Sequence, residues 1–344
     1  MISRAFTGYN RGVSGLEDFN QAERPSVSVV IPVYNSGQAL SELIQRLMPV
    51  LAAVTFESEV ILVNDGSRDN SWAEVESLVR TVPGVRGIDL TRNFGQHNAL
   101  LAGIRTARYD LVVTMDDDLQ HPPEEIPKLL AAMTEGVDLV YGVAAEEEHG
   151  FWRNASSRLA KAAMASSMGA STAKIVSAFR LFRTDLRDSF ETTADPFVSI
   201  DVLLSWVTGR VASAAVHMEP RRYGESNYTF RRLVRHAVNM ATGYSTIPLR
   251  LVSWVGLGFA LFGVLVFLYV IAVFVIEGGS VPGFPFLAAM IALLSGAQLF
   301  ALGIIGEYLG RMHFRSMQRP AYAIRMEIGA EPASQGSTSR ISKK

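Results

Sequence analysis

Three consecutive carboxylates are the most distinctive chemical group in this sequence. Asp116, Asp117 and Asp118 directly follow an apolar run, 111–115, that has the pattern of a buried strand. Adjacent carboxylates repel one another, and a divalent cation that prefers oxygen ligands relieves the repulsion. Asp116 and Asp118 could therefore bind Mg²⁺ or Mn²⁺, and Gln120 could add a neutral oxygen ligand.

This acidic run also indicates what kind of molecule the metal would bind. Mg²⁺ in proteins commonly lies between one or two carboxylates and the phosphates of a substrate. The run therefore favours a ligand that contains a diphosphate, such as a nucleotide. The alternative is a solvated acidic loop that leads into the helix expected after Pro122 and Pro123.

Two further groups of polar residues follow apolar runs of the same kind, 27–31 and 60–63, and Pro32 ends the first run. These residues are Pro32, Tyr34, Asn35, Asp65 and Gly66. Tyr34 could stack on a nucleotide base, and Asp65 could accept a hydrogen bond from a base or a ribose. Each group could equally be an ordinary turn, with Tyr34 as a half-buried ring.

The first 145 residues alternate between two patterns. Apolar, β-branched runs predict strands at 27–31, 60–63, 85–90, 111–115 and 139–142. Helical spacing predicts helices at 37–54, 71–82, 96–107 and 124–134. Buried strands that alternate with amphipathic helices predict an α/β fold with a mostly parallel sheet covered on both faces. Since the carboxyl ends of parallel strands share one edge, the three polar groups should converge on one crevice.

Composition excludes several classes of protein. The 344 residues include 32 Lys and Arg against 33 Asp and Glu, so there is no basic excess of the kind that nucleic-acid binding requires. The chain has no cysteine, which rules out disulfides, thiolate zinc sites and thiol catalysis. Residues 1–24 lack the apolar core of a signal peptide and are expected to form a flexible arm.

The apolar residues are concentrated near the carboxyl terminus. Residues 251–276 and 278–306 contain no charged side chain, and each run is long enough to span a bilayer as a helix. We expect a transmembrane helical hairpin over 248–310, with helices at about 251–276 and 284–306. Arginines flank both ends of the hairpin and the connecting loop has no Lys or Arg. This asymmetry predicts a multi-pass inner (plasma) membrane protein whose catalytic domain, termini and 311–344 tail are cytoplasmic.

The segment 229–247, ahead of the hairpin, has an amphipathic pattern. Phe230, Leu233 and Val234 alternate at helical spacing with Arg231 and Arg235 on the other side. Such a helix can lie among lipid headgroups and would hold a catalytic domain beside the bilayer. The alternative is a connector helix in solvent.

Several strings of this sequence resemble one enzyme family. They are VSVVIPVYN, VILVNDGSRDNSW, RNFGQHNALLAGI and MDDDLQHPPEEIPKLL, followed by RRYGESNYTFRRL and GIIGEYLGR. Their order and spacing resemble the inverting family 2 glycosyltransferases of the GT-A fold, over about residues 26 to 325. Within that family the chain is most similar to polyprenyl-phosphate glycosyltransferases, which include dolichol-phosphate mannose synthases, bactoprenol glucosyltransferases and undecaprenyl-phosphate aminoarabinose transferases.

The resemblance implies a GT-A domain over 25–228 and a role for each matching residue. Nucleotide-sugar contacts are implied for Pro32, Tyr34, Asn35, Asp65, Gly66 and Asp117, and for Arg92 and Gly95 in the segment that closes over the donor. Asp116 and Asp118 match the first and last acids of the family's DxD motif, where phosphates and metal meet, and Gln120 matches a position in the metal shell. The implied partners are a nucleotide-sugar donor, undecaprenyl phosphate and the bilayer, and such enzymes can form homo-oligomers.

The sequence departs from the family pattern at two positions. Ser36 stands where the family usually has Glu after PVYN, which puts one contact near the ribose in doubt. Lys174 stands where the family commonly has Asp, six residues before Arg180. Asp201 could take over the role of that missing carboxylate by a different route.

A lipid-phosphate acceptor changes what the catalytic site needs. A phosphate is already ionised near neutral pH, so it needs cationic positioning groups rather than a general base. Arg153, on a stretch with helical spacing, and Arg222, ahead of the amphipathic segment, are the preferred acceptor contacts. The alternatives are a non-catalytic membrane scaffold with a degenerate GT-A domain, and a transferase with another membrane acceptor. A processive polysaccharide synthase would show a QxxRW-like segment and more spanning helices.

Overall fold

The computed structural model describes residues 24–145, 172–190, 198–220, 247–277, 283–317 and 319–329. These residues belong to two compact units, one built around a β-sheet and one that contains the two long apolar helices. The expected arm at 1–24 lies outside the described residues except for Arg24. Arg153, Arg222 and the amphipathic segment 229–246 also lie outside them.

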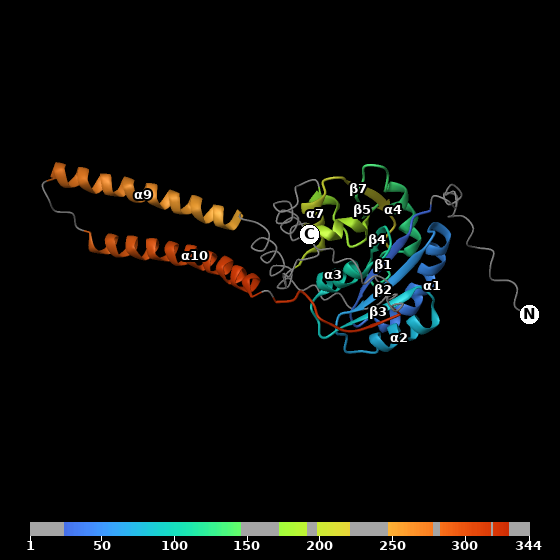
Figure 1. Cartoon of the computed structure of the whole chain (residues 1–344). Coiled ribbons are helices and arrows are strands. Elements are labelled where there is room, and N and C mark those ends of the chain that lie inside the picture. Colours follow the sequence, from blue (N-terminus) through green and yellow to red (C-terminus); the bar gives the residue numbers. More distant parts are fainter. Residues whose placement is uncertain are drawn as a thin grey trace, which may run out of the picture. The chain divides into compact units, whose positions relative to one another are not determined.

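The first unit contains an eight-stranded sheet of order β7-β5-β6-β4-β1-β2-β3-β8. Figure 1 labels six of these strands, from β7 and β5 through β4 and β1 to β2 and β3. Its strands are β1 (Val27–Val33), β2 (Ser58–Asn64), β3 (Val85–Leu90), β4 (Leu111–Thr114), β5 (Leu139–Ala144), β6 (Arg180–Arg183), β7 (Val211–Val216) and β8 (Ile324–Ile328). β6 and β8 run antiparallel to their neighbours, and the other neighbouring pairs are parallel. The expected α/β fold with a mostly parallel sheet is therefore confirmed.

Helices cover both faces of the sheet. They are α1 (Gly37–Val54), α2 (Ser71–Thr81), α3 (Gln96–Thr106), the short helices η2 (Pro123–Glu125), α4 (Ile126–Ala132), α6 (Thr172–Ile175) and η3 (Thr184–Phe190), and α7 (Ile200–Val207). Leu40, Leu43 and Leu47 of α1 are buried in one hydrophobic core, on the face that α2 and α4 also cover. Leu101 of α3 and Leu204 of α7 are buried in a second core on the opposite face.

The central strand β1 is longer than the sequence indicates. Pro32 was expected to end it, yet β1 continues to Val33, with Pro32 paired opposite Val63 of β2. On its other side, β1 pairs with β4 only as far as Val30 and Thr114. A proline lacks the N–H that a ladder needs, and it is accommodated here because the neighbouring strand has already ended. Pro32 therefore lies at the edge where ligands bind.

The segment assigned to a cytoplasmic tail supplies a strand of the sheet. β8 pairs antiparallel with β3, and its Glu327 forms an ion pair with Arg86 at 2.5 Å. Arg86 also binds the buried carboxylate of Glu59 at 2.6 Å. Residues 324–328, within the segment 311–344 that we expected to be a tail, form a short alternating strand at the edge of the sheet.

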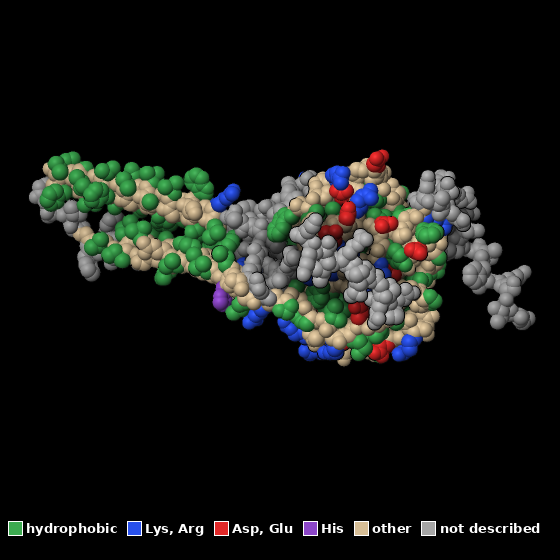
Figure 2. Space-filling model, viewed as in Figure 1, with side chains coloured by type: hydrophobic (Ala, Val, Ile, Leu, Met, Phe, Trp, Pro, Cys, Tyr) green, Lys and Arg blue, Asp and Glu red, His purple; other side chains and the backbone are tan. Residues whose placement is uncertain are grey.

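The second unit contains α9 (Ile247–Glu277) and α10 (Phe284–Ser316), which lie side by side as a hairpin. Figure 2 shows many hydrophobic side chains along the visible face of both helices. Segments 249–276 and 293–313 are long and apolar enough to cross a membrane, and none of their residues in the most apolar stretch is buried. A buried core helix of a soluble protein would not leave such a surface exposed. α10 begins at Phe284, and its carboxyl-terminal part carries an ion pair between Glu307 and Arg311 at 2.9 Å.

A close approach between α3 and the sheet gives a test of this fold. A Cβ atom on Gly103 would lie 2.4 Å from Val30 Cγ1 and 3.0 Å from Val63 Cγ2, both in the buried core. We expect Gly103→Val to lower the free energy of unfolding by about 3 kcal/mol through overpacking. Gly209→Val is the control, since nothing lies within 4 Å of a Cβ there. Denaturant unfolding of the full chain in detergent, monitored by near-UV circular dichroism, gives the free energy of unfolding of both variants. Equal values for Gly103→Val and Gly209→Val would contradict this packing.

Candidate functional site

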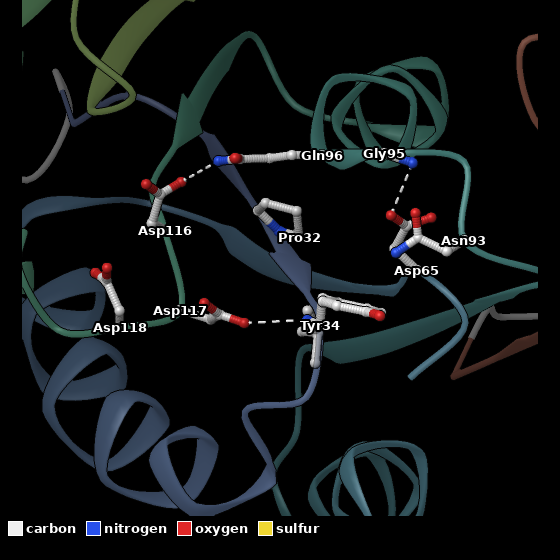
Figure 3. Close-up of a pocket in the computed structure, with 10 residues that line it drawn as sticks. Pro32, Tyr34, Asp65, Asn93, Gly95, Gln96, Asp116, Asp117 and Asp118 are labelled. Carbon is white, nitrogen blue, oxygen red and sulfur yellow. Dashed lines mark hydrogen bonds between the residues drawn. The ribbon is translucent and has the colours of Figure 1, made fainter. Parts of the chain in front are cut away.

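The carboxyl ends of β1, β2 and β4 surround one pocket with a cavity volume of about 210 Å³ (Figure 3). Its lining residues are Pro32, Val33, Tyr34, Asp65, Asn93, Gly95, Gln96, Asp116, Asp117 and Asp118. The structure thus brings together seven of the residues predicted from the sequence: Pro32, Tyr34, Asp65, Gly95, Asp116, Asp117 and Asp118. Asn35, Gly66, Arg92 and Gln120 are not among the lining residues, and Arg153 and Arg222 lie outside the described part of the chain.

The acidic turn after β4 is held in a strained backbone conformation. Leu119 has a φ of 61°, in the left-handed region that a branched side chain rarely adopts, and its side chain is completely buried. The reversal lets the backbone N–H of Gln120 donate a hydrogen bond to Asp118 Oδ1 at 3.1 Å. On the other side, Gln96 Nε2 of α3 donates to Asp116 Oδ1 at 2.6 Å. The side chains of Asp116 and Asp118 are thereby oriented by neutral donors.

The donor set of this turn fits a divalent cation that is shared with a substrate. Within the described residues, no three His, Asp or Glu side chains are grouped so that they could hold a metal ion by themselves. Two carboxylates from Asp116 and Asp118 are what Mg²⁺ uses when phosphate oxygens and water complete its shell. The pocket therefore suits a metal that arrives with a diphosphate.

Asp117, the middle acid, joins the turn after β1 to the acidic turn. Its Oδ2 accepts hydrogen bonds from the Tyr34 backbone N–H at 3.2 Å and from the Ser36 hydroxyl. Burial raises the pKa of Asp117 to about 6; these two hydrogen bonds oppose the rise, and the neighbouring Asp118 adds to it. The departure at Ser36 therefore supplies a hydroxyl that donates a hydrogen bond to Asp117, which an ionised glutamate side chain cannot do.

Asp65 fastens the loop that precedes α3. Its two carboxylate oxygens accept hydrogen bonds from the backbone N–H groups of Phe94 at 2.7 Å and Gly95 at 2.9 Å. Burial raises the pKa of Asp65, while these two N–H groups and the positive charge of Arg92 oppose the rise. Gly66 has a φ of +63°, and a Cβ there would lie 2.5 Å from the Asn93 backbone nitrogen. The turn after β2 and this loop are therefore in direct backbone contact.

Two predicted residues lie beside the pocket in supporting positions. Asn35 links two turns, because its backbone N–H donates to Ser67 Oγ at 3.0 Å and its Oδ1 accepts from the Arg68 N–H at 2.8 Å. The guanidinium of Arg92 lies 4.4 Å from the centre of the Phe94 ring, in an exposed loop.

Sequence reasoning missed two polar lining residues, Asn93 and Gln96. Both stand in the RNFGQH string, but neither residue type by itself indicates a ligand. Only the pairing of Gln96 with Asp116 shows that α3 contributes to the acidic turn.

The structure also shows the surroundings of Lys174, the second departure from the family pattern. Lys174 is exposed on α6, whereas Asp201 is buried and forms an ion pair with the buried Arg180. The Tyr141 hydroxyl donates a further hydrogen bond to Asp201 at 3.1 Å. Asp201 therefore serves as the counter-charge of Arg180, and its carboxylate is directed into the protein.

Comparison with known proteins identifies the family. Residues 28–190 match the family model described as Glycosyl transferase family 2. The chain is 36% identical over 310 residues to an undecaprenyl-phosphate 4-deoxy-4-formamido-L-arabinose transferase of Pseudomonas aeruginosa, with 89% of this chain and 91% of the relative covered. A protein of the same name from Proteus mirabilis is 35% identical over 308 residues, with 89% and 94% covered.

Among solved structures, glucosyl-3-phosphoglycerate synthase of Mycobacterium tuberculosis is similar over 65% of this chain and 82% of that chain, at 17% identity and a TM-score of 0.49. The family match and the curated relatives show that the chain belongs to the family 2 glycosyltransferases. The resemblance inferred from the sequence motifs is confirmed.

The contact between Ser36 and Asp117 gives a test of the site's geometry. We expect Ser36→Glu to lower the free energy of unfolding by about 1–2 kcal/mol, because it places a carboxylate against Asp117. In an Asp117→Ala background the same substitution should cost much less. Chemical denaturation of the wild type, both single variants and the double variant gives the coupling energy. Additive effects of the two substitutions would show that these side chains do not meet.

Proposed function

We propose that this protein is a membrane-bound, inverting glycosyltransferase that moves a single sugar from a nucleotide-diphosphate sugar to undecaprenyl phosphate. The observation that carries the proposal is the single pocket formed by the acidic turn and the turns after β1 and β2. The names of the relatives support the acceptor, since they specify an undecaprenyl-phosphate transferase. The product would be a lipid-linked sugar for assembly or modification of the cell envelope.

The donor half of the reaction follows from the residues of the pocket. Asp116 and Asp118, with Gln120 nearby, would hold Mg²⁺ or Mn²⁺, which stabilises the negative charge on the leaving diphosphate. Tyr34 is 47% exposed at the pocket, so its ring face is accessible to a base. Asp65 fixes the backbone of Phe94 and Gly95, and with it the loop that we expect to close over the donor.

The acceptor half needs positive charge rather than a base. The phosphate oxygen of the lipid attacks the anomeric carbon from the face opposite the departing nucleotide, which inverts the configuration there. Because the phosphate is ionised near neutral pH, no side chain has to remove a proton. Arg153 and Arg222 are the residues that we propose to bind this phosphate, since guanidinium groups bind phosphate in a bidentate manner.

The membrane part of the proposal rests on α9 and α10. We propose that they cross the inner membrane as a hairpin, with the catalytic domain in the cytoplasm and segment 229–247 at the headgroups. A non-catalytic scaffold is the second candidate, and the departures at Ser36 and Lys174 were its only support. The contact between Ser36 and Asp117 weakens this candidate, because the serine donates a hydrogen bond to the acidic turn.

The first test is transfer by membranes that contain the protein. The membranes are incubated with undecaprenyl phosphate, Mg²⁺ or Mn²⁺, and nucleotide sugars of uridine, guanosine and thymidine. The donors include a nucleotide of the sugar that the relatives' names specify. The lipid product is identified by its mass. We expect Asp118→Asn to lower the transfer rate at least about a hundredfold through loss of metal-assisted charge stabilisation, and EDTA to abolish transfer.

Asp110→Asn is the matched control, since this exposed carboxylate precedes the opposite end of β4. It should transfer sugar at the wild-type rate. Normal turnover by Asp118→Asn would contradict the metal role. A wild-type protein that transfers no sugar to undecaprenyl phosphate from any of these donors would contradict the proposed function.

The second test concerns orientation and uses the absence of cysteine from the chain. In intact cells, a membrane-impermeant maleimide should label Ser280→Cys, between the two apolar helices, and should not label Ser337→Cys, after them. Lysed cells provide the labelling control for both variants. The reverse pattern in intact cells would place the catalytic domain outside the cytoplasm.

A further inference from the structure

The strand that follows the membrane hairpin contains a β-bulge beside the donor pocket. In the pairing of β3 with β8, Met326 lies opposite Asp89 and Ile324 lies opposite Leu90, so Arg325 is the extra residue. A bulge of this kind redirects one side chain and is common next to active sites. Here it directs the Arg325 guanidinium to the end of β3, where the loop towards α3 begins.

Arg325 connects this strand to the turn after β2. Its Nη1 binds Asp89 Oδ2 at 3.0 Å, and Asp89 Oδ1 accepts a hydrogen bond from Asn64 Nδ2 at 2.7 Å. Asn64 Oδ1 in turn accepts a hydrogen bond from the Ser67 backbone N–H at 3.3 Å. Asp65, a pocket residue, lies between Asn64 and Ser67 in this turn. A continuous series of hydrogen bonds therefore runs from β8 to the turn that contains Asp65.

Arg325 also connects the strand to the loop before α3. Its Nη2 donates to the backbone oxygen of Thr91 at 2.8 Å, and the Thr91 N–H donates to the backbone oxygen of Ala323 at 2.9 Å. Both hydrogen-bonding groups of Thr91 are thus held by 323–325. This loop continues directly to Asn93 and Gly95 in the pocket lining.

Arg325 compensates the negative charge of the buried Asp89 carboxylate. Asp89 is 3% exposed, and a buried carboxylate is costly unless an opposite charge and hydrogen bonds compensate it. Arg325 supplies that charge from a side chain that is itself 58% exposed. Without the guanidinium, the Asp89 carboxylate would keep its hydrogen bond from Asn64 and lose its opposite charge. The backbone oxygen of Thr91 would lose the hydrogen bond from Arg325.

We propose that β8 is part of the donor site, and that Arg325 is a positioning residue for the two donor-binding segments, 64–67 and 91–95. The proposal deepens the proposed function and rests on it for the identity of the donor. It assigns a catalytic-domain role to a segment that follows the membrane hairpin in the sequence. The donor site would then be complete only when the chain has returned from the membrane and paired β8 with β3.

The test compares three substitutions in the full-length protein in detergent. Arg325→Met removes the charge and keeps the apolar stem, and Arg325→Lys keeps the charge without the two-armed geometry. Glu327→Gln is the matched control, because Glu327 lies on the same strand and contacts Arg86 instead of Asp89. Hydrogen exchange of the unliganded protein reports on the backbone amides, and steady-state kinetics report on the donor that the transfer assay identifies.

We expect Arg325→Met to accelerate exchange at the amides of Ser67, Phe94 and Gly95 by roughly tenfold, with little change in the centres of β1 and β2. The KM for the nucleotide sugar should rise roughly fivefold to tenfold, while the KM for undecaprenyl phosphate stays the same. Arg325→Lys should fall between the wild type and Arg325→Met, and Glu327→Gln should behave as the wild type at these amides and in donor KM.

Two results would overturn the proposal. One is unchanged exchange at these amides together with unchanged donor KM in Arg325→Met. The other is a uniform acceleration over the whole sheet, which would mean that Arg325 acts on global stability alone. Hydrogen exchange needs no donor, so a failure of the proposed function, seen as no transfer by the wild type, is distinguishable from a failure of this inference.

Discussion

The site depends on orienting several carboxylates together at one edge of the sheet. Asp116, Asp117 and Asp118 follow β4, and each accepts a hydrogen bond from a neutral donor: the Gln96 amide, the Ser36 hydroxyl or a backbone N–H. A neutral donor orients a carboxylate and adds no opposite charge of its own. The strained backbone at Leu119, fixed by a fully buried side chain, belongs to the same arrangement.

This edge is assembled from distant parts of the chain. The parallel pairing of β1 with β2 and β4 sets the turns that follow them side by side. Backbone N–H groups of Phe94 and Tyr34 donate hydrogen bonds to Asp65 and Asp117, and these join each turn to a neighbouring segment. On the other side of β3, the strand β8 contacts this edge through the hydrogen bond from Arg325 to Asp89. The segments that form β1 to β7 and the strand β8 therefore belong to one compact unit, although residues 227–319 lie between them in the sequence.

The sequence predicts this edge well because one rule governs it. Buried parallel strands are continuous apolar runs, and polar residues directly after such runs must meet. The rule located Asp65, Tyr34 and Asp116 correctly in one pocket. The rule gives no signal for β6 or β8, because neither is a continuous apolar run. β6 is four residues long and has an arginine at each end. β8 is five residues long, and Arg325 and Glu327 alternate with its apolar residues.

The remaining differences are matters of three-dimensional pairing. Nothing in the local sequence shows that Ser36 faces Asp117, or that the buried partner of Arg180 is Asp201, because these partners lie far apart along the chain. Gln96 was missed for the same reason, since an amide indicates a site only when its partner is known. Long-range contacts of this kind need the fold first.

The central claim is that Asp116 and Asp118 bind a divalent cation jointly with a nucleoside diphosphate. Electron paramagnetic resonance of Mn²⁺ added to the full-length protein tests it directly, with no nucleotide and with UDP, GDP or dTDP. The account predicts that Mn²⁺ is bound weakly by the protein alone and at least about tenfold more tightly with one of the nucleotides, because two carboxylates leave most of the metal's ligands to phosphate and water. Mn²⁺ binding that none of the three nucleotides strengthens would contradict it.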